Sequence, residues 1–107
     1  MKLAELIFEF TSNYPKSEIY GLVSQSRRCS VSIPSNIAEG YGRNSKKEFI
    51  QFLRVAYGSA LELETQVILA MNLKFVSEKK FQLVSNLLQE VLKMLNSMIT
   101  KLRKGNT

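Results

Sequence analysis

The sequence predicts an all-α protein, an antiparallel up-down four-helix bundle in a single domain over residues 1–107. Apolar residues recur every three or four positions along four segments, which is the period of an amphipathic helix. Pro15, Gly40 and Gly42 fall near natural breaks between these segments. Three of the segments are roughly 26 to 28 residues long, or about 40 Å, and short loops place successive helices antiparallel.

The first predicted helix runs from Lys2 to Phe10, and its apolar face contains Leu3, Leu6, Ile7 and Phe10. It is much shorter than the other three. One end of the bundle should therefore contain three helices and not four, and we expect exposed apolar surface there that could bind a partner.

The second helix is predicted to begin near Ser17, as an N-cap, and to end at Gly40 and Gly42. Pro34 lies inside it and removes one backbone hydrogen bond. Two short helices would accommodate the proline. One helix kinked at Pro34 is preferred, because the inward stripe keeps its phase across that position. The stripe contains Leu22, Ser26, Cys29, Ile33, Ile37 and Tyr41.

The third helix opens at Ser45 with Glu48 three residues later, a capping box, and runs to about Asn72. The fourth starts at Ser77 and runs to about Lys104. Its seam resembles that of a coiled coil and consists of Phe81, Val84, Leu88, Val91, Leu95, Met98 and Leu102.

The third and fourth helices carry more apolar residues than the inner face of a single bundle needs. On the third helix these include Val55 and Leu69, and on the fourth they include Leu87 and Ile99. Self-association is the leading explanation of the extra edges. Looser packing within one chain is the alternative.

Residue types exclude most catalytic chemistry. The chain has no His, no Asp and one cysteine, Cys29, so it lacks the ligands for a zinc or di-iron site and a base to activate a nucleophile. We expect no enzyme activity, metal or cofactor. A single thiol points to a reducing compartment. Glu5 and Glu9 interrupt the first apolar segment, which argues against a signal peptide or membrane span and favours the cytoplasm.

The acidic residues are interpreted as structural. Glu62 and Glu64 are two residues apart, so on a helix they point in different directions and cannot share one site. Glu39 and Glu64 fall near apolar stripes, where a charge needs a partner, which could be Arg27, Arg28 or Arg54 from a neighbouring helix. The predicted members of structural ion pairs are Arg27, Arg28, Glu39, Glu62 and Glu64.

Basic residues are the strongest functional signal, since the chain carries 15 Lys and Arg against 9 acids, a net charge of +6. Two clusters, around the predicted turn between the second and third helices and in the C-terminal tail, suit phosphate contact, with Tyr41 for stacking. A solvated helix cap and a C-terminus that favours cations are the alternative. The candidate nucleic-acid-binding residues are Arg43, Lys46, Lys47, Arg54, Lys101, Arg103 and Lys104.

The strings Ser32-Ile33-Pro34-Ser35-Asn36-Ile37-Ala38-Glu39-Gly40-Tyr41-Gly42-Arg43 and Gly58-Ser59-Ala60-Leu61-Glu62-Leu63-Glu64-Thr65-Gln66 resemble a known family. The chain is similar to the four-helix bundle proteins encoded by intervening sequences of bacterial 23S ribosomal RNA genes.

The resemblance implies a barrel-like homopentamer and no catalytic residues. It also implies a likeness to the accessory protein of diversity-generating retroelements, which binds nucleic acid and a reverse transcriptase. The sequence is therefore interpreted as a non-catalytic homo-oligomer that binds RNA or DNA through basic surfaces. A protein-protein interaction scaffold with no nucleic-acid role is the alternative.

Overall fold

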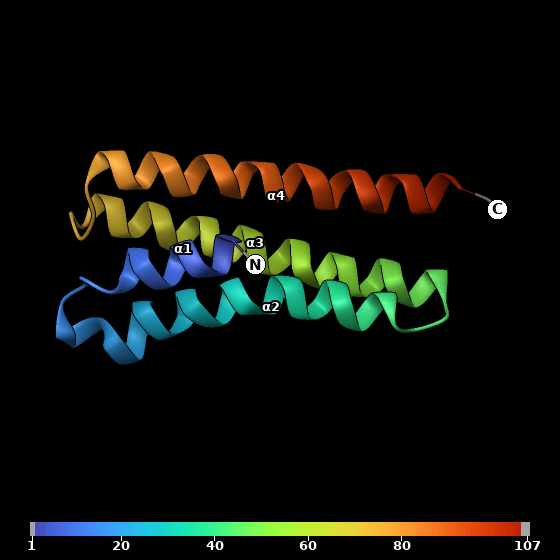
Figure 1. Ribbon diagram of the computed structural model, residues 1–107, viewed down its shortest axis with the longest axis horizontal. Coiled ribbons are helices and arrows are strands. Elements are labelled where there is room, and N and C mark those ends of the chain that lie inside the picture. Colours follow the sequence, from blue (N-terminus) through green and yellow to red (C-terminus); the bar gives the residue numbers. More distant parts are fainter. Residues whose placement is uncertain (1, 106–107) are drawn as a thin grey trace.

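The structure is a computed structural model that describes residues 2–105. It contains four α-helices, α1 (Lys2–Thr11), α2 (Ser24–Tyr41), α3 (Lys46–Asn72) and α4 (Glu78–Lys104), and no strand among the described residues. These elements confirm the predicted all-α class and the short first helix. The molecule is elongated, 49 × 23 × 18 Å, with α2, α3 and α4 side by side along its length (Figure 1).

The two ends of the molecule differ in how many helices they contain. In Figure 1, α1 lies along only one half of the bundle, where it packs against α2 and α4. We call residues 2–30 and 66–88 the covered half. The opposite end holds the connection between α2 and α3 and the last turn of α4; we call residues 41–48 and 101–105 the basic end.

The core of the covered half is built around α1. Leu3, Ile7 and Phe10 are buried, as their spacing predicted, while Leu6 is half-buried. Beyond α1, the ring of Tyr14 lies 6.1 Å from that of Phe10 and 5.3 Å from that of Phe75, measured between centroids. These aromatic contacts join the segment after α1 to the connection between α3 and α4.

The start of the second helix was predicted wrongly. Ser17 is not an N-cap of an α-helix, because Lys16–Glu18 form a 3₁₀ turn and Ile19–Val23 a π-helical turn before α2 begins at Ser24. Gly21, a poor helix former, lies within the π turn. The wider π turn changes the direction in which successive side chains point, and both Leu22 and Val23 are buried.

From Ser24, α2 continues through Pro34 to Tyr41 as one helix. The kink at Pro34 stays a prediction. Small polar side chains lie between α2 and α3: the Ser32 and Ser59 hydroxyls are 2.9 Å apart, and the Asn36 amide donates to Ser32 Oγ.

Ser45 caps α3 as predicted, and Ser77, where the fourth helix was predicted to start, caps α4. Ser45 Oγ accepts a hydrogen bond from the Glu48 backbone N–H, and Ser77 Oγ accepts one from Lys80 N–H, both at 3.2 Å. The Glu48 carboxylate faces the Arg43 guanidinium, 3.7 Å away, instead of completing the capping box. These caps fix where α3 and α4 begin, and the cap at Ser45 lies at the basic end.

Candidate nucleic-acid interface

The fold brings the two predicted basic clusters together. The connection between α2 and α3 lies at the same end of the molecule as the last turn of α4 (Figure 1). The Lys46 ammonium donates a hydrogen bond to the backbone carbonyl of Gly105, immediately after α4. Residues more than fifty positions apart in sequence therefore form one surface at the basic end.

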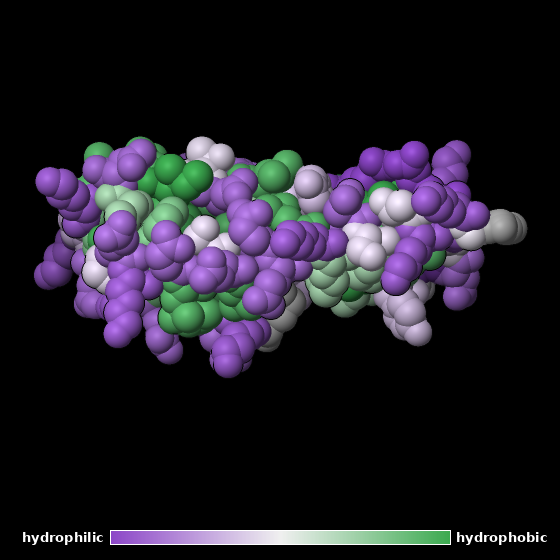
Figure 2. Space-filling model, turned by 90° about the horizontal axis from the view of Figure 1, so that it is seen from above, coloured by the Kyte–Doolittle hydropathy of each residue, from purple (hydrophilic) through white to green (hydrophobic). Residues whose placement is uncertain are grey.

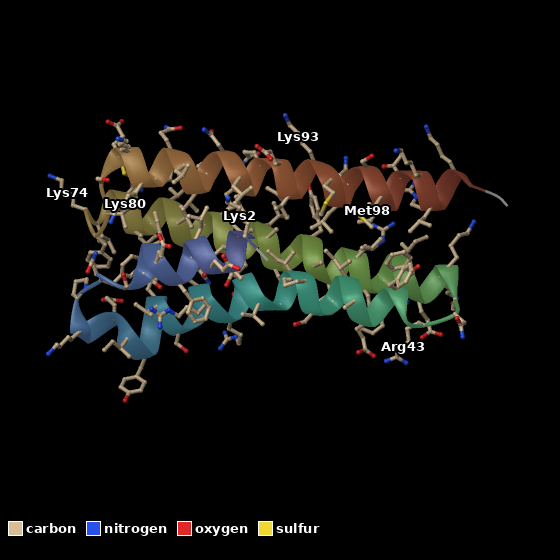
Figure 3. All side chains as sticks on the ribbon, viewed as in Figure 1. Lys2, Arg43, Lys74, Lys80, Lys93 and Met98 are labelled. Atoms are coloured by element: carbon tan, nitrogen blue, oxygen red, sulfur yellow. The ribbon has the colours of Figure 1, made fainter. Side chains whose placement is uncertain are left out.

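Arg43 differs from the other candidates because its charge is already paired. Its guanidinium lies 2.9 Å from the Glu39 carboxylate and 3.7 Å from that of Glu48, and 5.2 Å from the centre of the Phe52 ring. Figure 3 labels Arg43 beside the turn. Exposed pairs of this kind add little stability, about 0–1 kcal/mol, so their main effect is to orient the turn.

The remaining cations of the basic end are exposed, and none has an ion pair among residues 2–105. They are Lys46, Lys47, Lys101, Arg103 and Lys104. Arg54, also exposed, follows Lys47 by seven residues on α3, which places it two turns away on the same face. These unpaired charges are the part of the predicted set that can bind phosphate without first breaking an ion pair.

Two acidic residues of the predicted structural ion pairs, Glu39 and Glu64, have polar partners within the chain. Glu39 pairs with Arg43, four residues later in the turn after α2, and not with an arginine of a neighbouring helix. Glu64 accepts a hydrogen bond from the Gln89 side-chain amide, which links α3 to α4.

Arg27 holds the end of α1 against α2. Its Nε donates to Thr11 Oγ1 at 2.9 Å and its Nη2 to the Phe8 carbonyl at 3.3 Å, while the guanidinium lies 4.7 Å from the centre of the Phe8 ring. The cation therefore caps the last turn of α1, where backbone carbonyls lack partners. No local sequence signal predicts this contact, because Arg27 and its two partners lie 16 and 19 residues apart.

Cys29 is buried at the interface of α2 and α3, as predicted. Burial raises the pKa of its thiol, and the nearby Glu62 carboxylate raises it further. The Gln66 amide, 3.8 Å from Sγ, and Arg28 act in the opposite direction. A thiol that keeps its proton is a poor nucleophile. The prediction that Arg28 and Glu62 are members of structural ion pairs stays a prediction.

Two features are absent from residues 2–105, the part of the chain that the structure describes. No three His, Cys, Asp or Glu side chains gather there in a way that could hold a metal ion. No helix in this part of the chain is long and apolar enough to cross a membrane.

The family pattern of the 23S rRNA-intervening sequence proteins matches residues 1–97. The chain belongs to this family. A crystal structure of a protein of unknown function from the S23 ribosomal protein family of Bacteroides thetaiotaomicron superposes with a TM-score of 0.82 at 26% sequence identity, over 92% of each chain. No protein with a curated description matches the sequence.

In this 23S rRNA-intervening sequence protein, the family match covers one part of the basic end and not the other. Lys46, Lys47 and the paired Arg43 lie within residues 1–97, whereas the cations of the last turn of α4 follow them. The turn between α2 and α3 is therefore the part of the candidate interface that belongs to the family fold, and the tail of α4 adds charge to it.

Proposed function

We propose that this protein is a non-catalytic homo-oligomer that binds RNA or DNA through its basic end. The observation that supports nucleic-acid binding most directly is the meeting of two basic clusters, joined where Lys46 contacts the end of α4. Five exposed cations without ion pairs lie there in a chain of net charge +6. Neutralising phosphates releases counterions, which favours binding at low salt.

Self-association would make such a small site effective. One subunit offers a few phosphate contacts, each weakened by salt. Copies arranged around an axis would present the basic end repeatedly to one polymer, and linked sites bind more tightly than single ones. Five copies is the number that the family resemblance implies.

The outer surface of α3 supports association with a second copy. Leu61, Ile68 and Leu69 are each 42–45% exposed, and their spacing places them along one side of the helix. Leu73, which is 50% exposed, follows the last residue of α3. Val55, 53% exposed, precedes them by about two turns. Contiguous apolar surface on a helix face is typical of a protein interface.

Nucleic-acid binding is tested by fluorescence anisotropy with labelled RNA and DNA at several salt concentrations. We expect Lys46→Ala/Lys47→Ala to weaken binding and to reduce the slope of log K against log salt by roughly 1.4 to 1.8, for two lost phosphate contacts. Lys79→Ala/Lys80→Ala is the matched control, because it removes the same charge from the start of α4 in the covered half. Figure 3 labels Lys80 there, far from Arg43. Equal weakening by both variants would indicate a general charge effect and would contradict the proposed site.

Oligomerisation is tested by light scattering. We expect a mass several times the 12.2 kDa of one chain, falling toward one chain in Ile68→Glu. A wild-type mass of 12.2 kDa at micromolar concentration would contradict the proposed oligomer.

The alternative is a protein-interaction scaffold without a nucleic-acid role, favoured by the same exposed leucines and isoleucine of α3. A reverse transcriptase is the partner that the resemblance implies. Binding through apolar surface should change little with salt, whereas binding to phosphates should weaken steeply. Either function fits the proposed cytoplasmic location.

A further inference from the structure

Tyr41 is an aromatic residue that the fold leaves open to solvent. It is the last residue of α2 and is 80% exposed, in contrast to Tyr14, which is 7% exposed in the covered half. Its ring lies 6.0 Å from that of Phe49 at an angle of 73°. This edge-to-face contact orients the Tyr41 ring and leaves most of it accessible.

A shallow hollow of about 240 Å³ lies beside this ring. Its apolar walls include Tyr41 and Phe49, from the end of α2 and the start of α3, and Leu102 from the last turns of α4. Arg43 and Lys46 also line it. The hollow thus combines aromatic and aliphatic walls with cationic groups, and it exists only because α4 ends beside the turn between α2 and α3.

This combination matches the two parts of a nucleotide. A base has flat apolar faces that stack on aromatic side chains, and the phosphates beside it bind cations. In a duplex, the faces of a base are covered by its neighbours, so only an unpaired base can enter such a hollow.

We propose, on the basis of the nucleic-acid binding proposed above, that this hollow binds one unpaired base against Tyr41. The substrate is then single-stranded RNA or DNA. Lys46 and Lys47 hold the backbone beside the stacked base. Since every base has an aromatic face, recognition depends little on sequence. Phosphate contacts alone would not distinguish a single strand from a duplex, whereas stacking on Tyr41 does.

The test measures the affinity of a labelled single strand and of the same sequence as a blunt duplex. We expect Tyr41→Leu to bind the single strand about 5- to 100-fold more weakly than the wild type, with little change for the duplex. Tyr41→Phe should restore binding, because it keeps the aromatic ring. Tyr20→Leu is the matched control: Tyr20 is 95% exposed and lies in the covered half, so its loss should not matter. Photocrosslinking with a 4-thiouridine strand should place the adduct on the peptide that contains Tyr41.

Failure of this inference is distinguishable from failure of the proposed function. If single strand and duplex bind equally, and both weaken in Lys46→Ala/Lys47→Ala but neither in Tyr41→Leu, the basic end binds nucleic acid and the base-stacking inference is wrong. If the wild type binds neither at low salt, both proposals are wrong. Circular dichroism of Tyr41→Leu should match the wild type, since so exposed a ring adds little to the fold.

Discussion

The covered half and the basic end use the same helices in different ways. In the covered half, α1 supplies a fourth helix, Arg27 fastens its end, and the ring of Tyr14 packs between Phe10 and Phe75. At the basic end only α2, α3 and α4 meet, and the aromatic Tyr41 is exposed among cations. Figure 2 shows hydrophobic residues gathered on one face over the covered half, whereas the opposite end is mostly hydrophilic.

This contrast indicates a division of roles along one bundle. Burial of apolar side chains supplies most folding free energy, so the covered half should dominate stability. Exposed charges contribute little to stability but attract anionic partners. Substitutions in the two regions should therefore affect different measurements, and the predictions below test that separation.

The largest expected effect is loss of a core aromatic ring in the covered half. Phe10 is 5% exposed, so Phe10→Ala should lower the free energy of unfolding by about 3–5 kcal/mol. Tyr41→Ala, at the basic end, should change it by less than about 0.5 kcal/mol. Urea denaturation at one protein concentration measures both. Similar losses for the two variants would contradict the proposed division.

A smaller effect is expected from adding one methyl group to each of two helical glycines. A Cβ on Gly40 would lie 2.6 Å from Phe52 Cβ and 3.0 Å from Phe49 Cδ1, whereas one on Gly58 meets nothing within 4 Å. Gly40→Ala should therefore destabilise the protein by about 1–3 kcal/mol. Gly58→Ala should stabilise it by about 0.5–1 kcal/mol, because alanine favours a helix.

Thermal unfolding of Gly40→Ala and Gly58→Ala measures both effects. Close packing at Gly40 would show that a tightly fitted contact between α2 and α3 lies directly beside the open surface of the basic end. A destabilising Gly58→Ala would instead indicate that another copy covers the outer surface of α3.

The sequence predicted the helices better than their connections. The caps at Ser45 and Ser77 are local signals, and the side-chain oxygen of each bonds an N–H three residues later. The π turn at Ile19–Val23 was missed, because apolar periodicity places Leu22 toward the core whether the turn is α or π.

The candidate site was predictable in composition but not in arrangement. Both basic clusters are visible in the sequence, yet only the fold places Lys46 against the end of α4. Pairing was less predictable: Glu39 has Arg43 four residues after it, a known helical spacing, whereas its expected partners were arginines of other helices. Contacts between distant elements, such as that of Arg27 with Thr11, depend on packing that a single sequence does not encode locally.

The smallest predicted effect is a dependence of stability on alkaline pH that originates in the covered half. Burial raises the pKa of Tyr14 well above its ordinary value of 10.0. In the unfolded chain this phenol loses its proton near pH 10, while in the folded chain it keeps it. The contribution is therefore fully present below about pH 10 and falls as the pH rises above it. For this group alone the loss of folding stability by about pH 10.5 is roughly 0.8 kcal/mol.

Tyr14→Phe tests this prediction, because it keeps the ring contacts with Phe10 and Phe75 but has no phenol proton to lose. Thermal unfolding followed from pH 8 to 10.5 should show a shallower decline in stability for this variant than for the wild type. Tyr20→Phe, at a 95% exposed position, should follow the wild-type curve. Parallel curves for all three proteins would show that Tyr14 titrates as freely in the folded state as in the unfolded one, and the covered half would then be less closed than the structure indicates.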